Sequence, residues 1–225
     1  LPALIRVQAG DRVIAPSVGI GHAADVIHML GRSDGAKALD TYLVTVSDHG
    51  LNASTFAARV VASTQAGLTS AVLAGLGALK GPLHGGAPGP VIDMLDAIAA
   101  DGDRKGWIDR ALDNGERLMG FGHRIYRTRD PRADALKTAL RSFDHVDARL
   151  RFAEGVERVA LDALHRRKPD RVLETNVEFY TALLLEAVGF PKHAFTGVFA
   201  MGRVAGWLAH AREQALTGRL IRPAS

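Results

Sequence analysis

Two adjacent segments, residues 52–63 (NASTFAARVVAS) and residues 68–79 (LTSAVLAGLGAL), decide the fold class of this chain. Apolar residues recur in both at spacings of three and four, which is the period of an amphipathic helix. Asn52 or Ser54 is expected to cap the first helix through its side chain. The second helix should stop at Gly81-Pro82, because proline disfavours helical backbone in the residue before it. Two helices are therefore expected, and the alanines and glycines of the second permit close packing.

The same helical spacing continues along the chain, and runs that alternate between polar and apolar residues are few. Asp130-Pro131 is a strong helix start, with the aspartate as cap and the proline in the first turn. Gly189 and Pro191 mark the end of the helix that begins at Asn176. Further helices are predicted over residues 90–100, 105–118, 131–142, 146–167, 176–188 and 194–216. The sequence therefore predicts an all-α fold.

The composition is that of a soluble globular protein, with 47% hydrophobic and 23% charged residues in 225. No apolar run approaches the roughly 20 residues that a membrane-spanning helix needs, so no membrane role is expected. Residues 1–6 (LPALIR) lack the features of a secretory signal, and the cytoplasm is the expected location. The absence of cysteine excludes disulfides, thiolate metal sites and a cysteine nucleophile.

The net charge of +4 does not come from a basic tract, because basic and acidic residues alternate along most of the chain. The one tight basic run, residues 166–168 (RRK), is interpreted as a solvated helix end rather than a phosphate-binding patch. A small polyanionic substrate accounts for the arginine excess equally well. No nucleic-acid partner is expected, and a basic nucleic-acid binder remains a distant alternative.

Three short stretches place acid–base or anion-binding groups beside glycine or at a helix start: residues 81–86 (GPLHGG), 119–124 (MGFGHR) and 175–180 (TNVEFY). Glycine lets the backbone and a substrate approach a neighbouring side chain closely. The two imidazoles and one carboxylate of these stretches can do proton chemistry on a carbonyl compound. The candidate catalytic residues are His84, His123 and Glu178.

Each candidate also has a purely structural interpretation. Thr175 and Glu178 have the spacing of a capping box, in which the glutamate bonds the backbone N–H of the cap residue. His123 is equally well a turn histidine bonded to backbone carbonyls. His49 follows Asp48, which either orients its ring or makes a helix-end hydrogen bond with it. From the local sequence alone, a site role for His84 is as well supported as a structural one.

Metal and nucleotide chemistry are not supported by the sequence. The chain has no His-Glu-x-x-His motif and no cysteine, and its histidines lie on separated segments, so no metal site is expected. Residues 85–89 (GGAPG) are glycine-rich, but they lack the lysine and the serine or threonine of a P-loop.

Five blocks in order resemble the signature blocks of the citrate synthase family: residues 47–55 (SDHGLNAST), 81–86, 119–124, 130–132 (DPR) and 176–178 (NVE). The resemblance covers essentially the whole chain. It implies a large helical domain interrupted by a smaller helical domain, with the active site in the cleft. By the blocks, residues 1–85 and 186–225 would form the large domain, and residues 86–185 the small one. The family has a substantial stretch before the part that resembles Leu1, so this chain is expected to lack the amino-terminal part.

The resemblance implies a role for each member of the catalytic set. Glu178 would be the base that removes the α-proton, at a position where the family has aspartate, which is one methylene shorter. His84 would hydrogen-bond the thioester carbonyl as that oxygen gains negative charge, and His123 would polarise the ketone of oxaloacetate.

The resemblance also implies binding roles, with Arg203 and Arg222 matched through the short stretches 201–203 (MGR) and 221–223 (IRP). His49, Arg132 and Arg203 would contact the oxo-acid, and Arg222 would reach it from the partner subunit. Arg127 would meet a coenzyme A phosphate. An arginine fits a carboxylate bidentately, although each of these arginines has the simpler interpretation of a surface salt bridge or an exposed cation.

The implied function is that of a citrate synthase of the tricarboxylic acid cycle, an acyltransferase that condenses acetyl-CoA with oxaloacetate and hydrolyses the thioester to citrate and CoA. The alternatives are a 2-methylcitrate synthase that uses propionyl-CoA, and a non-catalytic paralogue that binds CoA or a partner enzyme. The acyl-CoA would be a co-substrate, with no permanently bound cofactor. The small-residue helix at residues 68–79 and the role implied for Arg222 favour a homodimer.

Overall fold

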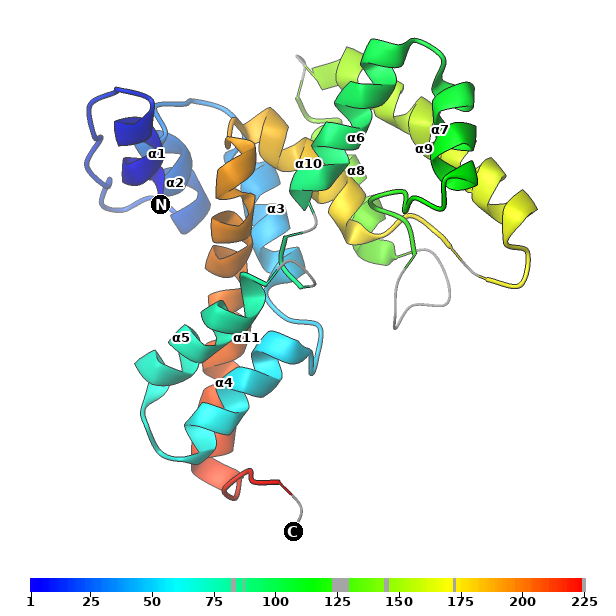
Figure 1. Ribbon diagram of the computed structural model, residues 1–225. Coiled ribbons are helices and arrows are strands. Elements are labelled where there is room, and N and C mark those ends of the chain that lie inside the picture. Colours follow the sequence, from blue (N-terminus) through cyan, green and yellow to red (C-terminus); the bar gives the residue numbers. More distant parts are fainter. Residues whose placement is uncertain (82–83, 87, 123–129, 144–145, 172, 224–225) are drawn as a thin grey trace. The chain divides into compact units, whose positions relative to one another are not determined.

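The computed structural model describes residues 1–81, 84–86, 88–122, 130–143, 146–171 and 173–223, and these form helices joined by short loops (Figure 1). The described part contains no β-strand, only an isolated bridge between Phe121 and Thr175. The predicted all-α fold is confirmed. The helices in chain order are α1 (Pro2–Gln8), α2 (His22–Met29), α3 (Ala36–Val46), α4 (Ala53–Ser63), α5 (Leu68–Leu79), α6 (Pro88–Asp101), α7 (Arg104–Asp113), α8 (Pro131–Leu140), α9 (Asp147–Arg167), α10 (Val177–Val188) and α11 (Phe195–Thr217), with a short 3₁₀ turn, η2 (Lys192–Ala194).

Every helix predicted from residue 52 onward is present, and one ends early. The helix expected over residues 105–118 stops at Asp113. Gly115 follows with φ of 76°, and the backbone N–H of Glu116 bonds the carbonyl of Ala111, which closes the helix end. The three helices α1, α2 and α3 lie in the first 50 residues, where no helix is predicted from the sequence.

The chain forms two compact units, described here one at a time. Unit 1 consists of Leu1, Tyr42–Gly86 and Thr196–Ser225, and unit 2 consists of Pro2–Thr41 and Ala87–Phe195. The domain division implied by the family resemblance, residues 1–85 with 186–225 against 86–185, remains a prediction.

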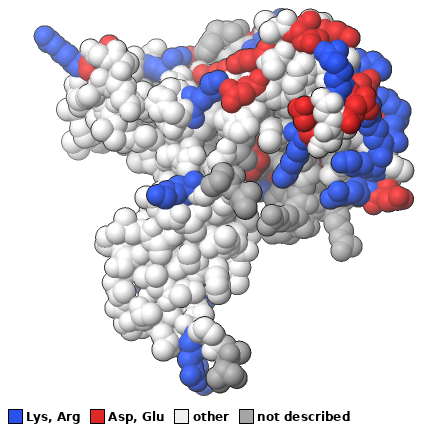
Figure 2. All heavy atoms as spheres, viewed as in Figure 1, with Lys and Arg blue, Asp and Glu red and all other residues white. Residues whose placement is uncertain are grey.

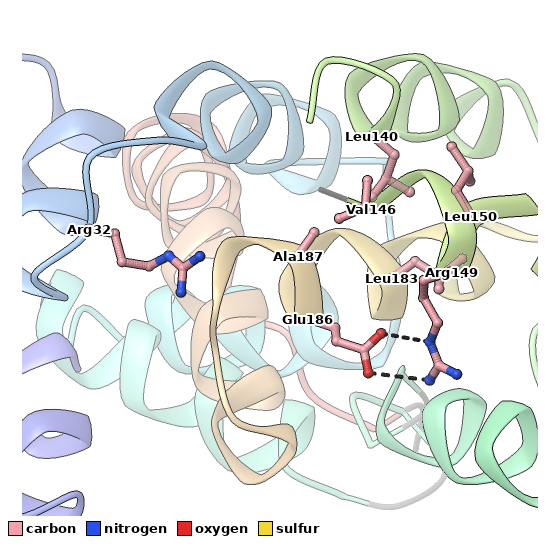
Figure 3. A pocket seen from close by; sticks show the side chains of 8 residues that line it. All are labelled: Arg32, Leu140, Val146, Arg149, Leu150, Leu183, Glu186 and Ala187. Carbon is pink, nitrogen blue, oxygen red and sulfur yellow. Dashed lines mark hydrogen bonds and ion pairs between the residues drawn. The ribbon is translucent and has the colours of Figure 1, made fainter. Parts of the chain in front are cut away.

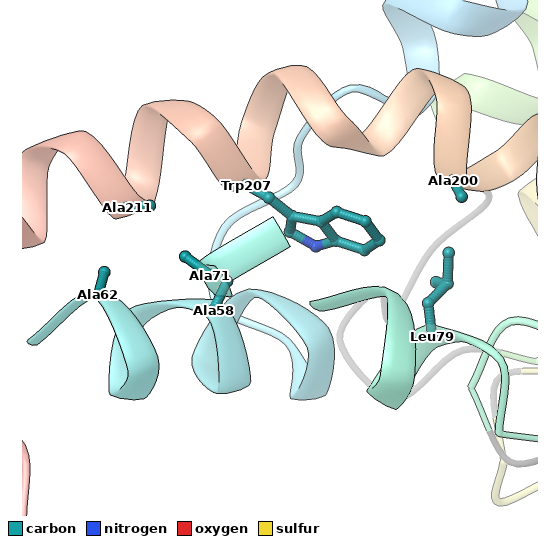
Figure 4. Packing of buried hydrophobic residues seen from close by; sticks show 7 residues of the cluster. All are labelled: Ala58, Ala62, Ala71, Leu79, Ala200, Trp207 and Ala211. Carbon is teal, nitrogen blue, oxygen red and sulfur yellow. The ribbon is translucent and has the colours of Figure 1, made fainter. Parts of the chain in front are cut away.

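Unit 1 is built around Trp207 of α11, whose indole is fully buried (Figure 4). Small residues of α4 and α5 surround the ring and let the three helices approach closely. A Cβ on Gly75 of α5 would lie only 2.8 Å from the indole, so glycine is required at that point. The cluster consists of Ala58, Ala62, Ala71, Leu79, Ala200, Trp207 and Ala211.

Unit 2 has α10 at its centre, because nine of the twelve residues of this helix are buried. α10 packs against α8 and α6, and α7 packs against α9. The helix ends as predicted at Gly189, which has φ of 96° and donates its backbone N–H to the carbonyls of Leu185 and Glu186. Basic and acidic side chains alternate over the α6 to α9 surface in Figure 2, and the run at 166–168 lies at the carboxyl end of α9. No helix in the described ranges is long and apolar enough to cross a membrane.

Candidate functional site

His84 lies in unit 1 against the start of α4. Its Nε2 is 2.8 Å from the hydroxyl of Ser54, and the backbone N–H of Ser54 donates to the same nitrogen at 3.3 Å. The indole N–H of Trp207 in turn donates to the Ser54 hydroxyl at 3.2 Å. The loop is held from α11 as well, since the hydroxyl of Thr196 donates to the carbonyl of Gly85. His84 is therefore fixed through a serine at a helix start.

These contacts assign the tautomer of His84. A backbone N–H only donates, so Nε2 accepts and the ring proton sits on Nδ1. Burial, together with the positive charge of Arg203, lowers the pKa of His84 below its ordinary value. The amino end of α4 also carries partial positive charge, which disfavours an imidazolium beside it. His84 is a neutral imidazole whose Nδ1–H is the donor.

Arg203 and His49 also belong to unit 1. Arg203 is fully buried on α11, its Nε donates to the carbonyl of Val46 at 2.7 Å, and its guanidinium stacks on Phe199. His49 is half-buried. Its neighbour Asp48 accepts from the backbone N–H of Gly50, and one of its oxygens lies 3.1 Å from Nε2 of His210. Unit 1 thus places His84 within the electrostatic field of a buried arginine.

Three further candidates are Arg222, His123 and Arg127. Arg222 is exposed, and the backbone N–H of its neighbour Ile221 bonds the hydroxyl of Ser63. His123 and Arg127 lie outside the described residues.

Glu178 lies in the first turn of α10 in unit 2, and the cap of this helix is Asn176. The side chain of Asn176 accepts from the backbone N–H of Glu178 at 3.0 Å. Thr175 is not the cap, because its hydroxyl donates to Oε1 of Glu157 at 2.7 Å. The interpretation of Thr175 and Glu178 as a capping box is therefore wrong, because the cap of this helix is Asn176.

Asp130 ties the start of α8 to the start of α10. It caps α8 as predicted, and its carboxylate receives Nε and Nη2 of Arg132 at 3.0 and 2.8 Å. The backbone N–H of Val177 donates to the same carboxylate at 3.2 Å. Burial alone would raise the pKa of Asp130. The hydrogen bonds from Arg132 and Val177 outweigh burial and hold this pKa below its ordinary value. Arg132 and Glu178 thus stand on two helix starts joined by one ionised aspartate.

The segment before His123 is paired with the segment before Glu178. The backbone N–H of Gly122 donates to the carbonyl of Glu174, and that of Asn176 donates to the carbonyl of Gly120. A Cβ on Gly120 would lie 2.8 Å from the side chain of Phe179, and its φ is 84°, so the motif needs glycine here for two reasons. The sequence reasoning that glycine permits close approach is confirmed at this position.

Glu178 is half-buried, and burial raises its pKa to about 7. The positive charges of Arg117 and Arg132 act in the opposite direction, and the negative charge of Asp130 adds to the rise. A carboxylate with a pKa near neutrality is a stronger base than an ordinary glutamate. Unit 2 therefore offers a tuned proton acceptor at a helix start.

A cavity of about 290 Å³ lies elsewhere in unit 2 and contains none of the predicted site residues (Figure 3). Its floor is aliphatic, and Arg149 bonds Glu186 at its edge. Its lining residues are Arg32, Leu140, Val146, Arg149, Leu150, Leu183, Glu186 and Ala187. Among the residues that the structure describes, no cluster of histidine and carboxylate side chains has the arrangement of a metal site.

Sequence reasoning located the candidates but missed the residues that hold them. The sequence indicates Ser54 only as a possible cap, and it gives no indication of a role for Trp207 or Glu157. Their contacts join positions 30, 153 and 18 residues apart, so no local motif signals them.

Comparisons with known proteins agree with the sequence blocks. The family model described as "Citrate synthase, C-terminal domain" matches residues 2–224. The citrate synthase of Haloferax volcanii is 40% identical over 228 residues, which cover 99% of this chain and 59% of that protein. The chain spans about half to three fifths of the length of the curated relatives it matches.

Solved structures share the fold. A citrate synthase from Thermoplasma acidophilum, solved as a ternary complex with carboxymethyl coenzyme A and oxaloacetate, matches with a TM-score of 0.86 at 32% identity, covering 100% of this chain and 61% of that one. A citryl-CoA lyase from Hydrogenobacter thermophilus matches with a TM-score of 0.79 at 27% identity, covering 92% of this chain and 82% of that one.

Proposed function

Because the chain belongs to the citrate synthase family, we propose that it condenses acetyl-CoA with oxaloacetate and hydrolyses the thioester to citrate and free CoA. The observation that carries the proposal is the protonation of two groups, one a neutral hydrogen-bond donor and the other a carboxylate with a raised pKa. His84 is a neutral donor, and burial raises the pKa of Glu178 to about 7. Forming an enolate from a thioester needs a base and a donor of these kinds.

In this mechanism Glu178 removes a proton from the methyl carbon of acetyl-CoA. The Nδ1–H of His84 donates to the thioester oxygen, which gains negative charge as the carbon is deprotonated. A neutral imidazole suits this role because it stabilises the oxygen by a hydrogen bond without an added charge of its own. The enolate carbon then forms the new C–C bond with the ketone carbon of oxaloacetate, whose C=O π bond opens so that its oxygen takes up a proton and becomes the hydroxyl. Water then cleaves the thioester to give citrate and the thiol of CoA.

His123 is the proposed electrophilic partner, polarising the ketone of oxaloacetate. His49, Arg132 and Arg203 are the proposed ligands of the oxo-acid, whose two carboxylates suit the planar fork of arginine. Arg132 bonds Asp130, which holds its guanidinium in a defined orientation. Arg127 is the proposed ligand of a coenzyme A phosphate.

We further propose a homodimer, with Arg222 acting in the partner's site. The support is the surface of α4 and α5, which carries few charged side chains in Figure 2. Phe56, Leu73 and Leu76 are exposed there, and apolar exposure of this kind is typical of a surface that binds another chain. Cytoplasmic location and a place in the tricarboxylic acid cycle belong to the same proposal.

Two neighbouring activities are the alternatives. The first is a 2-methylcitrate synthase, since a site for propionyl-CoA differs by one methyl group, which hydrophobic contacts discriminate by only about 1–3 kcal/mol. The second is citryl-CoA cleavage, because the lyase from Hydrogenobacter thermophilus shares the fold. A paralogue that binds CoA without turnover is the non-catalytic alternative.

The test is release of free CoA, followed with a thiol reagent, to which the cysteine-free protein contributes no background. Acetyl-CoA and propionyl-CoA are compared with and without oxaloacetate, and citryl-CoA is supplied in a separate reaction. Release from acetyl-CoA that depends on oxaloacetate is the expected result. A preference for propionyl-CoA identifies the methylcitrate activity, and formation of acetyl-CoA from citryl-CoA without oxaloacetate-dependent release of free CoA from acetyl-CoA identifies the lyase. Binding of acyl-CoA without any of these reactions would contradict the catalytic proposal.

A further inference from the structure

The carboxylate of Glu157 lies behind the start of α10, on the neighbouring helix α9. The residue is 5% exposed, and its two oxygens have partners on two other segments. The hydroxyl of Thr175 donates to Oε1 at 2.7 Å, and the phenol of Tyr180 donates to Oε2. The ammonium group of Lys137 on α8 is 3.3 Å from Oε2. Glu157 is thus a buried, fully bonded acid that the mechanism above does not use.

The placement of these partners is specific. Thr175 precedes Glu178 by three residues and Tyr180 follows it by two, so the two residues bonded to Glu157 bracket the proposed base. A buried carboxylate is costly unless it is hydrogen-bonded, and hydrogen bonds to an ionised acceptor are short and strong. Glu157 therefore holds both sides of this turn with bonds that cannot be exchanged for water.

Two further contacts fix the same turn. The side-chain amide of Asn176 donates to the carbonyl of Gly122, and the backbone N–H of Val177 donates to Asp130. With Glu157 they hold the start of α10 at three points. The bonds of Glu157 reach Glu178 through the chain on either side of it, so the effect of Glu157 on the base passes through the backbone between Thr175 and Tyr180.

We propose that Glu157 is a positioning residue, which holds the start of α10 so that the carboxylate of Glu178 keeps its place and its sheltered surroundings. The inference rests on the function proposed for Glu178. The charged groups around the pair are Lys137, which faces Glu157, and Arg117, Arg132 and Asp130, whose charges act on Glu178. Loosening the turn admits water to Glu178, so its pKa falls toward that of an ordinary glutamate.

The test compares Glu157→Gln with Glu154→Gln. Glu154 lies one turn earlier on α9, also bonds Lys137, and forms a surface ion pair with Arg141, so its substitution removes the same charge from the same helix. In Glu157→Gln the amide cannot accept from all three donors. Its kcat is expected to fall on the order of tenfold to a hundredfold, with the KM for oxaloacetate nearly unchanged. Glu154→Gln is expected to retain the wild-type kcat.

A second pair of variants tests the same hydrogen bond from its other end, in case Glu157→Gln does not fold. Thr175→Ser keeps the hydroxyl and Thr175→Val removes it with little change in shape, so turnover should be retained in the first and reduced in the second. Equal kcat values in this pair, or a kcat of Glu157→Gln equal to that of Glu154→Gln, would overturn the proposal.

A readout without turnover separates this inference from the proposed function. Carbon-13 NMR of labelled glutamate carboxyls follows the titration of Glu178 in each folded variant, with Glu178→Gln to assign its signal. The titration midpoint should fall in Glu157→Gln and stay in place in Glu154→Gln. A wild-type protein with no CoA release would contradict the proposed function, and the NMR comparison would still decide the role of Glu157. An unchanged Glu178 midpoint in Glu157→Gln would overturn it.

Discussion

His84 and Glu178 both lie at a helix start capped by an asparagine, yet the two sites move the pKa values of their groups in opposite directions. Asn52 caps α4, where His84 accepts a backbone N–H, and Asn176 caps α10, where Glu178 occupies the first turn. The partial positive charge of a helix start lowers the pKa of either group. Burial lowers the pKa of His84 and raises that of Glu178 to about 7.

The difference shows that a helix start does not by itself fix a protonation state. At His84 the helix and burial act together, since both disfavour a cation. At Glu178 they oppose each other, and burial prevails even against Arg117 and Arg132. The same local structure can therefore present a neutral hydrogen-bond donor in one unit and a tuned base in the other.

The largest expected effect is that of Glu178→Gln on turnover. The amide keeps the size of the side chain but cannot take a proton, so oxaloacetate-dependent CoA release should fall by about 10²–10⁴-fold. Glu178→Asp is the matched control, since it restores the family's residue and retains a base. Wild-type rates in Glu178→Gln would show that proton removal does not use this carboxylate.

His84→Ala is expected to have the next largest effect. Loss of one donor to the developing negative charge on the thioester oxygen should lower kcat by about 10²–10³-fold. A fall of this size in kcat, with little change in the KM for oxaloacetate, places the role of His84 at the thioester. A change confined to the KM for oxaloacetate would move His84 to the other substrate.

A smaller effect is expected on stability, with opposite signs at the two sites. The pKa of Glu178 is raised from 4.5 to about 7 by folding, so ionising it destabilises the native state as pH rises between these values, by up to about 3 kcal/mol. Glu178→Gln should therefore be more stable than wild type at pH 8, with the difference vanishing near pH 4.

The pKa of His84 is lowered by folding, so its protonation destabilises the native state as pH falls below 6.5. His84→Gln should accordingly have a higher free energy of unfolding than wild type below about pH 6.5, and this gain should be absent at higher pH. Urea titrations across this pH range measure both variants, and parallel stability profiles would contradict the opposed pKa shifts.

The smallest expected effect concerns the caps. Asn52→Ala and Asn176→Ala should each cost about 1 kcal/mol of unfolding free energy, measured by urea titration, because each removes a side-chain acceptor for helix-start N–H groups. Both amides also donate, that of Asn52 to the carbonyl of Gly50 and the hydroxyl of Thr55, and that of Asn176 to the carbonyl of Gly122, so the two losses should be similar. A loss near zero in either variant would show that its side chain contributes little to the helix start.

The sequence predicted the helices from residue 52 onward because their starts and stops are chemically marked, as at Asp130-Pro131 and Gly189. Helix α2 lacks such a mark, because its N-cap is Gly21, which has no side chain to bond the helix start. The ordered blocks identified the family, and most of the candidate residues came from the same blocks. Thr175 was misread because its local pattern fits a cap, whereas its hydroxyl is taken by Glu157, a residue 18 positions earlier. A contact of that range leaves no trace in local spacing.

The bond between the indole of Trp207 and Ser54 gives the protein an internal fluorophore at its candidate site. The chain has two tryptophans, and Trp207 is fully buried. Its indole N–H donates to the hydroxyl of Ser54, and the same hydroxyl lies 2.8 Å from Nε2 of His84. In a Trp107→Phe background, the emission of Trp207 would report directly on the surroundings of His84. A ligand that contacts His84 could then be titrated optically, without a dye and without turnover.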